Sequence, residues 1–378
     1  MAIASAIAAA LIHGYLLKSH YDLHYGEVSG SLMCDISSRF SCSAASASRW
    51  AEFLGVPMAL WGLLANVAFV TLAAWDPLTE GEGRPANRTG LLVISGVLAL
   101  ASVVMGVISL TSLNTMCPFC LVTYVLSLVT LAGTWMGYKP GLKLTFKLTF
   151  VGVVFAFGIS AFILNDQLRS GYTDGQDTGL RTAAALQDWQ QNPKLEIAET
   201  DPLSLGPSRA EAKMLIAEFA DFRCIHCKLA AAPIKAFVNS HPDVRLEFYS
   251  WPLDGECNSS IQQANGASCL LARTVWCARN KAQKGWEAHE QVFTRFEEWK
   301  STDAVRAGFD SLAKAIGMPA EDLKACADSD VAKSAILAQA RLGSSLNIKG
   351  TPAIYVNGKL LPAGSSIPSL SAVYGTLR

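Results

Sequence analysis

Charged side chains are scarce in this 378-residue chain, of which 16% is charged and 51% is hydrophobic. The scarcity is confined to residues 1–164, because the composition from residue 166 onward is that of an ordinary soluble protein. The formal net charge is zero and no basic tract of the kind that binds phosphate backbones is present, which argues against a nucleic-acid partner. We therefore predict a membrane half followed by a soluble half.

The chain also lacks any grouping of cysteine and histidine with the spacing of a four-ligand zinc site, so no metal site is expected. It nevertheless contains ten cysteines, and four of them form two CxxC pairs, Cys117 with Cys120 and Cys224 with Cys227. Such usage is typical of an oxidising compartment. The other six cysteines are Cys34, Cys42, Cys257, Cys269, Cys277 and Cys326.

Five apolar stretches are candidates for membrane helices: residues 2–17, 54–75, 91–113, 117–137 and 148–164. The first lacks both a basic leader and a clear cleavage site, so we interpret it as a retained span and not as a signal peptide. Basic residues in the loops after the second and fourth stretches predict that these loops face the cytoplasm. They are Arg84, Arg88, Lys139, Lys143 and Lys147. Alternation then places all ten cysteines on the opposite, oxidising side.

Two cysteine pairs lie at this outer membrane face. Cys34 and Cys42 are eight residues apart on a mostly polar loop and can close a small disulfide, which is either a structural staple or a shuttle. Cys117 and Cys120 begin an apolar stretch, where the positive end of the helix dipole lowers the pKa of a thiol. A second redox pair at the same face favours the shuttle, because thiol exchange needs one sulfur that moves between two partners.

Further motifs accompany the two cysteine pairs of residues 1–136. The set is Cys34 with Cys42, Ser48-Arg49-Trp50, Gly55-Val56-Pro57, Cys117-Pro118-Phe119-Cys120, and Tyr124 one helical turn further on. Taken together, these motifs resemble the vitamin K epoxide reductase family over about residues 1–136. More closely, the chain is similar to bacterial members in which that domain is fused to a thioredoxin-like one.

The resemblance implies a role for each membrane-side sulfur. Cys120 would lie nearest a quinone of the ubiquinone or menaquinone type, with Cys117 as its exchanging partner. Cys42 would link to Cys117, and Cys34 would meet the incoming dithiol. Ser48 would support this site.

The same resemblance implies that Tyr124 and Phe119 contact the quinone. In the animal enzymes an asparagine early in the second span also contacts the ligand. Met58 takes that position here and Asn66 does not match it. This departure disfavours epoxide reduction and favours quinone reduction.

The soluble half shows a β-type run at 214–220, then Cys224-Ile225-His226-Cys227, then a helical pattern. This order is the structural context of a thioredoxin-like site. A helical stretch at 253–346 and the position of His226 make the domain similar to the DsbA-like proteins. That similarity implies that Cys224 is the exposed nucleophile, that Cys227 is the resolving thiol, and that His226 stabilises the thiolate. It also implies that Thr351-Pro352 is a cis peptide facing the two cysteines.

Four cysteines of the soluble half are predicted to form two structural disulfides. Cys269 and Cys277 would lie on one helix with about 12 Å of rise between them, too far for a bridge. The remaining pairings stay open, and we favour Cys257 with Cys269 and Cys277 with Cys326.

The expected fold is therefore a five-helix transmembrane bundle, made of a four-helix redox core and one linking span, followed by an α/β thioredoxin-like domain with a helical insertion. The expected boundaries are 1–165, a linker at 166–206, and 207–378. The expected activity is disulfide formation in reduced secreted or periplasmic client proteins by a multi-pass protein of the bacterial inner membrane. Alternatives are vitamin K epoxide reduction, a membrane-anchored disulfide isomerase, and a module in which Cys224 and Cys227 bind metal.

Overall fold

The computed structural model describes residues 1–25, 34, 40–48, 50–78, 83–111, 116–138, 148–172, 175–264, 266–362 and 364–377. These residues form two compact units, one within residues 1–178 and the other from residue 179 onward. We call the first of these unit 1 and the second unit 2.

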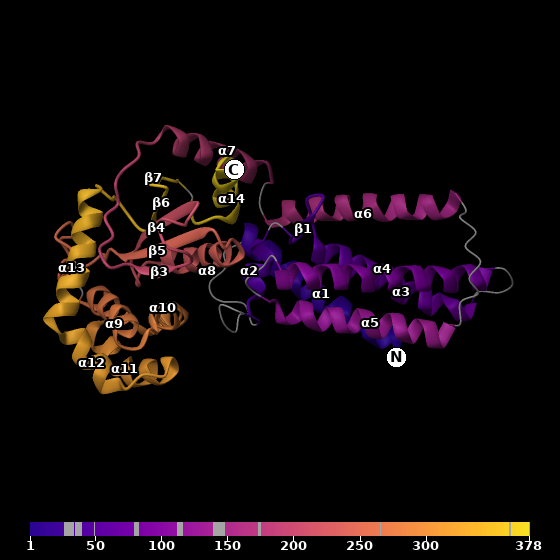
Figure 1. Ribbon diagram of the computed structural model, residues 1–378, viewed down its shortest axis with the longest axis horizontal. Coiled ribbons are helices and arrows are strands. Elements are labelled where there is room, and N and C mark those ends of the chain that lie inside the picture. Colours follow the sequence, from indigo (N-terminus) through magenta and orange to yellow (C-terminus); the bar gives the residue numbers. More distant parts are fainter. Residues whose placement is uncertain are drawn as a thin grey trace. The chain divides into compact units, whose positions relative to one another are not determined.

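Unit 1 consists mainly of long apolar helices, and α1, α3, α4 and α5 run side by side (Figure 1). The contacts join α1 to α3 and α5, and α4 to the same two helices. Four helical segments are long and apolar enough to cross a membrane: Ala2–Tyr25, Met58–Leu78, Arg84–Thr111 and Pro118–Gly137. The elements of unit 1 are α1 (Ala2–Tyr25), α2 (Cys42–Ala47), β1 (Glu52–Phe53), β2 (Val56–Pro57), α3 (Met58–Trp75), η1 (Asp76–Leu78), α4 (Gly83–Thr111), α5 (Pro118–Tyr138) and α6 (Leu148–Tyr172).

Small residues allow these helices to approach closely. A Cβ on Gly133 would lie 3.0 Å from the backbone nitrogen of Ala2, so glycine at this position permits the contact between α5 and α1. The His13 ring occupies the space in which a side chain at Gly62 would stand, between α1 and α3. Small residues at interfaces are typical of helices that pack within a membrane.

Helix α1 is longer than the sequence predicts, because it continues from residue 17 to Tyr25. Polar residues of these two extra turns stabilise the helix through the Lys18–Asp22 ion pair at i,i+4 spacing. Helix α6 packs on α1, and the Tyr21 hydroxyl donates to Asn165 Oδ1 over 2.7 Å. Arg49, Lys139, Lys143 and Lys147 lie outside the described residues.

Unit 2 is built on a five-stranded sheet in the order β3-β5-β4-β6-β7. Strands β4 and β5 are parallel and are connected through α8, whereas the other neighbours are antiparallel. The strands are β3 (Leu203–Leu205), β4 (Met214–Ala220), β5 (Val244–Ser250), β6 (Ala353–Val356) and β7 (Lys359–Leu360). Strands β4, β5 and β6 are almost wholly buried. Strands β4 and β6 are apolar apart from Glu218, as is typical of buried strands, whereas β5 also carries Arg245 and Glu247, which form an ion pair.

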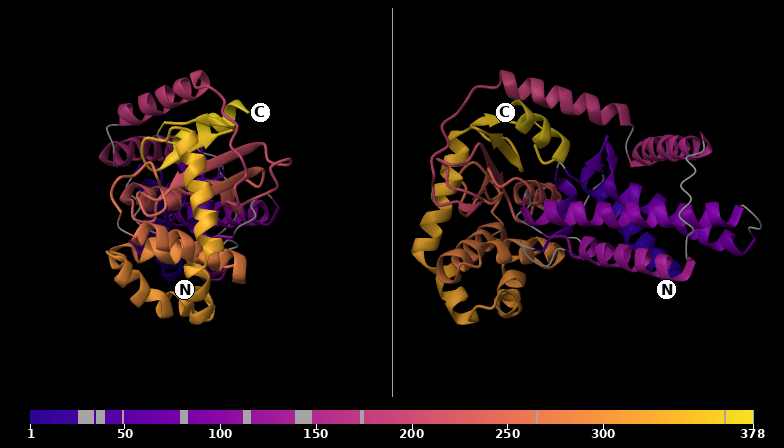
Figure 2. Two further views of the ribbon diagram at one scale, coloured as in Figure 1. Left: turned by 90° about the vertical axis from the view of Figure 1, so that its left-hand side faces the viewer. Right: turned by 45° about the vertical axis from the view of Figure 1, so that its right-hand side comes forward.

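Helices cover both sides of this sheet. Between β5 and β6 the chain forms α9 to α13, the predicted helical insertion, in which α9 to α12 gather beyond the β3 edge of the sheet, whereas α7 lies beyond the β7 edge (Figure 2). The helices are α7 (Gly175–Gln191), α8 (Ile225–Ser240), α9 (Ala267–Ala282), α10 (Gly285–Thr294), η2 (Phe296–Glu298), α11 (Thr302–Ile316), α12 (Ala320–Asp328), α13 (Asp330–Ser345) and α14 (Ile367–Thr376).

The segment predicted as a linker at 166–206 is largely structured. Its first residues extend α6, and residues from 179 onward belong to unit 2. The Trp189 indole N–H donates to the Val356 carbonyl over 3.0 Å, and Arg209 Nη1 donates to the Ile197 carbonyl over 2.9 Å. The polar composition suggested a tether, but a few apolar anchors such as Ile197 pack it against the sheet.

We predict that Gly343→Ala destabilises unit 2. Gly343 lies on α13, where an added Cβ would overlap the indole of the buried Trp251, and overpacking of this kind costs about 1–3 kcal/mol. Gly375→Ala on α14 is the matched control, because nothing lies within 4 Å of its Cβ position. Thermal unfolding should show a lower melting temperature for Gly343→Ala only. An equal effect of both substitutions would contradict the packing argument.

Candidate functional site

Three buried cysteines of unit 1 form a cluster. Cys34 is bonded to Cys42, Cys117 is bonded to Cys120, and the Sγ atoms of Cys42 and Cys117 are 3.4 Å apart. Cys34, Cys42 and Cys117 are each at most 3% exposed. The structure therefore brings the two predicted pairs together, with one sulfur of each pair in van der Waals contact.

Backbone pairing holds the two cysteine segments side by side. Phe40 and Met116 form an isolated parallel bridge, and the Ser41 N–H donates to the Met116 carbonyl over 2.9 Å. The Ser41 hydroxyl also accepts from the Ala44 N–H and caps α2, the helix that Cys42 begins. The Cys42–Cys117 approach thus depends on the residues immediately before each cysteine.

Cys117 stands directly before α5, whose first residue is Pro118. Proline is well suited to this position because its missing N–H would have had no partner within the helix. The Cys120 N–H donates to Cys117 Sγ over 3.1 Å. Unpaired amides and the helix dipole at such an end favour a thiolate.

The three residues predicted to contact the quinone, Phe119, Tyr124 and Met58, have surroundings that differ from one another. Phe119 packs against the cysteine cluster and meets the Tyr15 ring edge-on at 5.3 Å between centroids. Tyr124 lies one turn after Cys120, with ring atoms 3.8–3.9 Å from where a Cβ on Gly106 of α4 would stand. Met58, the first residue of α3, is not among the described residues packed against the cluster.

Ser48 has a structural role in the described structure. It ends α2, and its hydroxyl donates to the Ala45 carbonyl over 2.8 Å. It therefore fixes the end of the short helix that carries Cys42.

In unit 2 the second CxxC pair opens α8. Cys224 is its N-cap, directly after β4 and a short turn, and its N–H donates to the Asp221 carbonyl over 3.2 Å. The Thr351–Pro352 peptide is cis, and Cys224 Sγ lies 3.4 Å from the Thr351 carbonyl oxygen. The site thus joins residues that are 127 positions apart in the chain. Both thiols are free in this structure.

The two thiols have opposite electrostatic character. The neighbouring Cys227 thiol is the leading cause that lowers the pKa of Cys224 to about 5, with help from Thr351 and the backbone amides of Cys227 and His226, while burial acts in the opposite direction. Burial raises the pKa of Cys227 well above its ordinary value. Cys224 is therefore the thiolate, and Cys227 is a sheltered thiol.

Two features of this pair differ from the sequence prediction. Cys224 is only 9% exposed, so the nucleophile is less accessible than expected, although Cys227 at 0% is more sheltered still. The exposed His226 side chain makes no hydrogen bond with the Cys224 sulfur, and only its backbone acts on it. Side chains two positions apart in a helix do not face each other, which explains the separation.

The sequence analysis missed two buried acids beneath the pair, Glu218 on β4 and Asp221 just after it. Burial, followed by the negative charge of Cys224, raises the pKa of Glu218 to about 8. Glu218 is 2% exposed, and its Oε1 has no hydrogen-bond partner among the described residues. The sequence signal for Glu218 is that it is the one acidic residue in an otherwise apolar strand.

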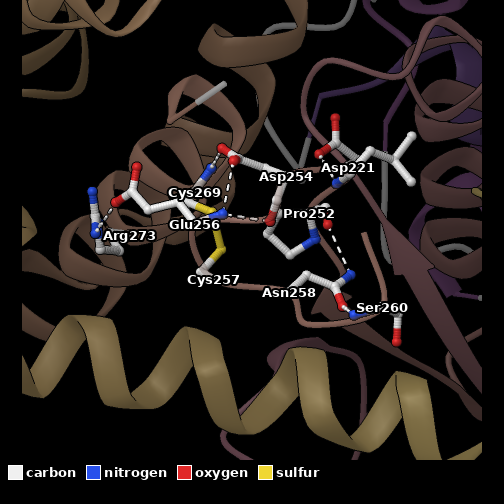
Figure 3. The surroundings of a disulfide bond; sticks show 10 residues. Asp221, Pro252, Asp254, Glu256, Cys257, Asn258, Ser260, Cys269 and Arg273 are labelled. Atoms are coloured by element: carbon white, nitrogen blue, oxygen red, sulfur yellow. Dashed lines mark hydrogen bonds and ion pairs between the residues drawn. A yellow bond between two sulfur atoms is a disulfide. The ribbon is translucent and has the colours of Figure 1, made fainter. Parts of the chain in front are cut away.

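Asp221 connects the active pair to a disulfide-bonded loop (Figure 3). Its Oδ2 accepts from the Leu253 N–H over 2.8 Å, and its pKa is raised by burial. The neighbouring Asp254 accepts from the N–H of Cys269, which is bonded to Cys257. The other disulfide joins Cys277 to Cys326, so the structure has the pairing that the sequence analysis favours.

Each half of the chain matches a known protein family. Residues 1–135 match the vitamin K epoxide reductase family, and residues 215–375 match the DSBA-like thioredoxin domain. The chain thus resembles a domain of each kind, with two cysteine pairs in the first match and the Cys224–Cys227 pair in the second. These matches support a thiol–disulfide oxidoreductase, and the four long apolar helices among the described residues support a membrane protein.

Among its relatives is disulfide bond formation protein D of Bacillus subtilis, 25% identical over 157 residues. The match covers 40% of this chain and 66% of that protein, slightly less than two thirds of its length. Oxidised BdbD from Bacillus subtilis has a TM-score of 0.40 at 20% identity, covering 49% of this chain and 96% of that chain. A thioredoxin-like oxidoreductase from Silicibacter pomeroyi has a TM-score of 0.38 at 25% identity, and the match covers 46% of this chain and 91% of that chain.

We predict that Cys224 of the reduced protein is alkylated by iodoacetamide with a midpoint near pH 5, because only the thiolate reacts. Cys227→Ala removes the leading cause of the low pKa and should raise the midpoint by roughly one pH unit or more. Mass spectrometry of the Cys224 peptide measures the rate. His226→Ala is the control and should leave the midpoint in place. A midpoint unaffected by Cys227→Ala would refute this assignment.

Proposed function

We propose that this protein makes disulfides in client proteins outside the cytoplasm and passes the electrons to a membrane quinone. The order is client, Cys224–Cys227, Cys34–Cys42, Cys117–Cys120, quinone. The observation that carries the proposal is the 3.4 Å distance between Cys42 Sγ and Cys117 Sγ. Attack of one sulfur on the other requires little movement.

Each thiol step exchanges one disulfide for another. A thiolate of the reduced Cys224–Cys227 pair attacks Cys34 Sγ, which breaks the Cys34–Cys42 bond and releases Cys42 as a thiolate. Cys42 Sγ then attacks Cys117 Sγ, which breaks the Cys117–Cys120 bond and releases Cys120. Within the mixed disulfide between Cys224 and Cys34, Cys227 attacks Cys224 Sγ, which releases Cys34 as a thiolate and leaves Cys224 bonded to Cys227. When Cys34 then displaces Cys117 from Cys42, the loop disulfide is restored and two electrons rest on Cys117 and Cys120.

The surroundings of Cys120 suit an apolar acceptor. Cys120 is partly exposed, unlike the buried Cys117, and exposed apolar residues of α5 follow it, among them Leu121 and Val125. We infer that Phe119 and Tyr124 hold the quinone there. A contact between Met58 and the quinone has less support, because Met58 is not among the described residues packed against the cysteine cluster. A bound quinone supplies a two-electron, two-proton acceptor. The chain contributes the helix terminus that stabilises the Cys120 thiolate.

Glu218 completes the proposed cycle in unit 2. To displace a client from Cys224, the Cys227 thiol must lose a proton in a buried site, where water cannot readily accept it. Glu218 lies close enough for its charge to act on Cys227, and its pKa of about 8 suits a group that gains and loses a proton near neutrality. We propose that Glu218 is the proton acceptor for Cys227.

Localisation completes the proposal. We infer a bacterial inner membrane protein with five spans, α6 being the fifth, and the thioredoxin-like domain on the periplasmic or extracytoplasmic side. The basic loops support this orientation. Glutathione on the cytoplasmic side would keep Cys224 and Cys227 reduced and would stop the cycle.

The relay is tested by Cys120→Ala. Without Cys120, the Cys117 thiolate should attack Cys42 and form a stable Cys42–Cys117 disulfide while Cys34 becomes a free thiol. Non-reducing peptide mapping should find this linkage in most molecules, and quinone-dependent oxidation of a reduced client should cease. The Cys277–Cys326 disulfide is the internal control. Unchanged turnover in the variant would eliminate the relay.

Glu218→Gln tests the proton acceptor. General-base contributions are about 10²–10⁴-fold, so release of a client disulfide from Cys224 should slow by at least about tenfold at pH 7. The rate in the parent should rise as the pH approaches 8, where more Glu218 is ionised, and this rise should be absent in the variant. Stopped-flow fluorescence of unit 2 tryptophans measures both. Identical pH profiles would exclude the role.

A further inference from the structure

Two histidines and a glutamate gather beside the segment that carries Cys42. His20 and His24 lie one turn apart on α1, and Glu52 comes from β1. One potential ligand atom from each residue lies within 4.8 Å of the other two. His20 Nε2 is 3.2 Å from Glu52 Oε1, and the rings of His20 and His24 stack with 4.1 Å between centroids.

The remaining ring nitrogens orient both imidazoles. His24 Nδ1 is 2.9 Å from the His20 carbonyl oxygen, which can only accept, so in the neutral ring the proton is on Nδ1 and Nε2 keeps its lone pair. No described residue makes a hydrogen bond with His24 Nε2. His20 Nδ1 is 3.0 Å from the Ser46 hydroxyl, which leaves His20 Nε2 toward Glu52. Second hydrogen bonds of this kind are typical of metal-binding histidines.

We propose that His20, His24 and Glu52 bind a divalent transition-metal ion of the Zn²⁺ class. Two imidazole nitrogens and one carboxylate are a common zinc ligand set, with water in the fourth position. Metal–ligand distances of about 2.0–2.2 Å require the three groups to draw closer than they are in this structure. Glu52 is exposed and can supply that movement.

The site lies beyond the apolar part of α1. At 1.5 Å per residue, the 24 residues of this helix are about 36 Å long, which exceeds a hydrocarbon core of about 30 Å. His20 and His24 lie in its last two turns, on the side of the cysteine cluster. The positive charge of Arg169 acts on both Glu52 and His24, so we expect it to weaken metal binding.

A bound ion would fasten the segment carrying Cys42 to α1. Ser46 lies one turn after Cys42 on α2 and holds His20, while Glu52 follows shortly after this helix. The metal would therefore link Glu52 to α1, in addition to the hydrogen bond that already joins Ser46 to His20. This inference does not depend on the proposed electron relay.

The test is Zn²⁺ titration of the untagged full-length protein in detergent, measured by calorimetry after oxidation of Cys224 and Cys227 with diamide. Oxidation is essential because thiolates also bind zinc, whereas disulfides do not. We expect one Zn²⁺ per chain and a higher melting temperature with zinc. Co²⁺ should give visible d–d bands without a sulfur charge-transfer band.

His24→Gln and Glu52→Gln should each weaken binding tenfold or more and remove the thermal shift. Glu52→Gln is informative even if His24→Gln folds poorly, because Glu52 is exposed. His241→Gln removes a histidine of unit 2 and is the matched control, with unchanged stoichiometry. Absence of zinc binding to the oxidised parent, or binding that both cluster substitutions leave intact, would overturn the proposal.

Discussion

A sulfur at the N-terminus of a helix is the arrangement on which both units depend. Cys117 precedes α5 and Cys224 precedes α8, so each meets backbone N–H groups that have no partner within the helix. Such an end favours the thiolate, which is the form that attacks a disulfide. The same arrangement therefore serves a helix of the membrane domain and a helix packed on a sheet, although the two domains share no topology.

Much of this arrangement follows from local sequence. A buried strand, a CxxC pair and a helix follow one another at residues 214–240, and each local preference agrees with the tertiary structure. The cis Thr351–Pro352 bond and the placement of Cys34 and Cys42 beside Cys117 came instead from resemblance to known families. Spacing alone carries no information on which residues meet across 75 or 127 positions.

Other features of the structure cannot be predicted from local sequence, for physical reasons. The end of α1 predicted from hydropathy comes too early. A helix continues beyond its apolar stretch when polar side chains pair along it, as Lys18 and Asp22 do. Polar composition made residues 179–206 resemble a tether, although a few buried side chains dock them. The sequence does not indicate that His20, His24 and Glu52 meet, because they come together only where β1 brings the carboxylate back to α1.

The contrast between Cys224 and Cys227 supports the proposed direction of electron flow. The pKa of Cys224, about 5, lies two units below pH 7, so the thiol is ionised at neutral pH. This ionisation stabilises the reduced pair by about 3 kcal/mol at pH 7. Stabilising the reduced pair makes its disulfide more oxidising toward clients, but it also makes reoxidation harder. A free CxxC protein with this property would stop after one turnover. In the proposed relay, a covalently attached oxidant would resolve the conflict, because tethering would raise its effective concentration to roughly millimolar and give each reduced pair a partner on the same chain.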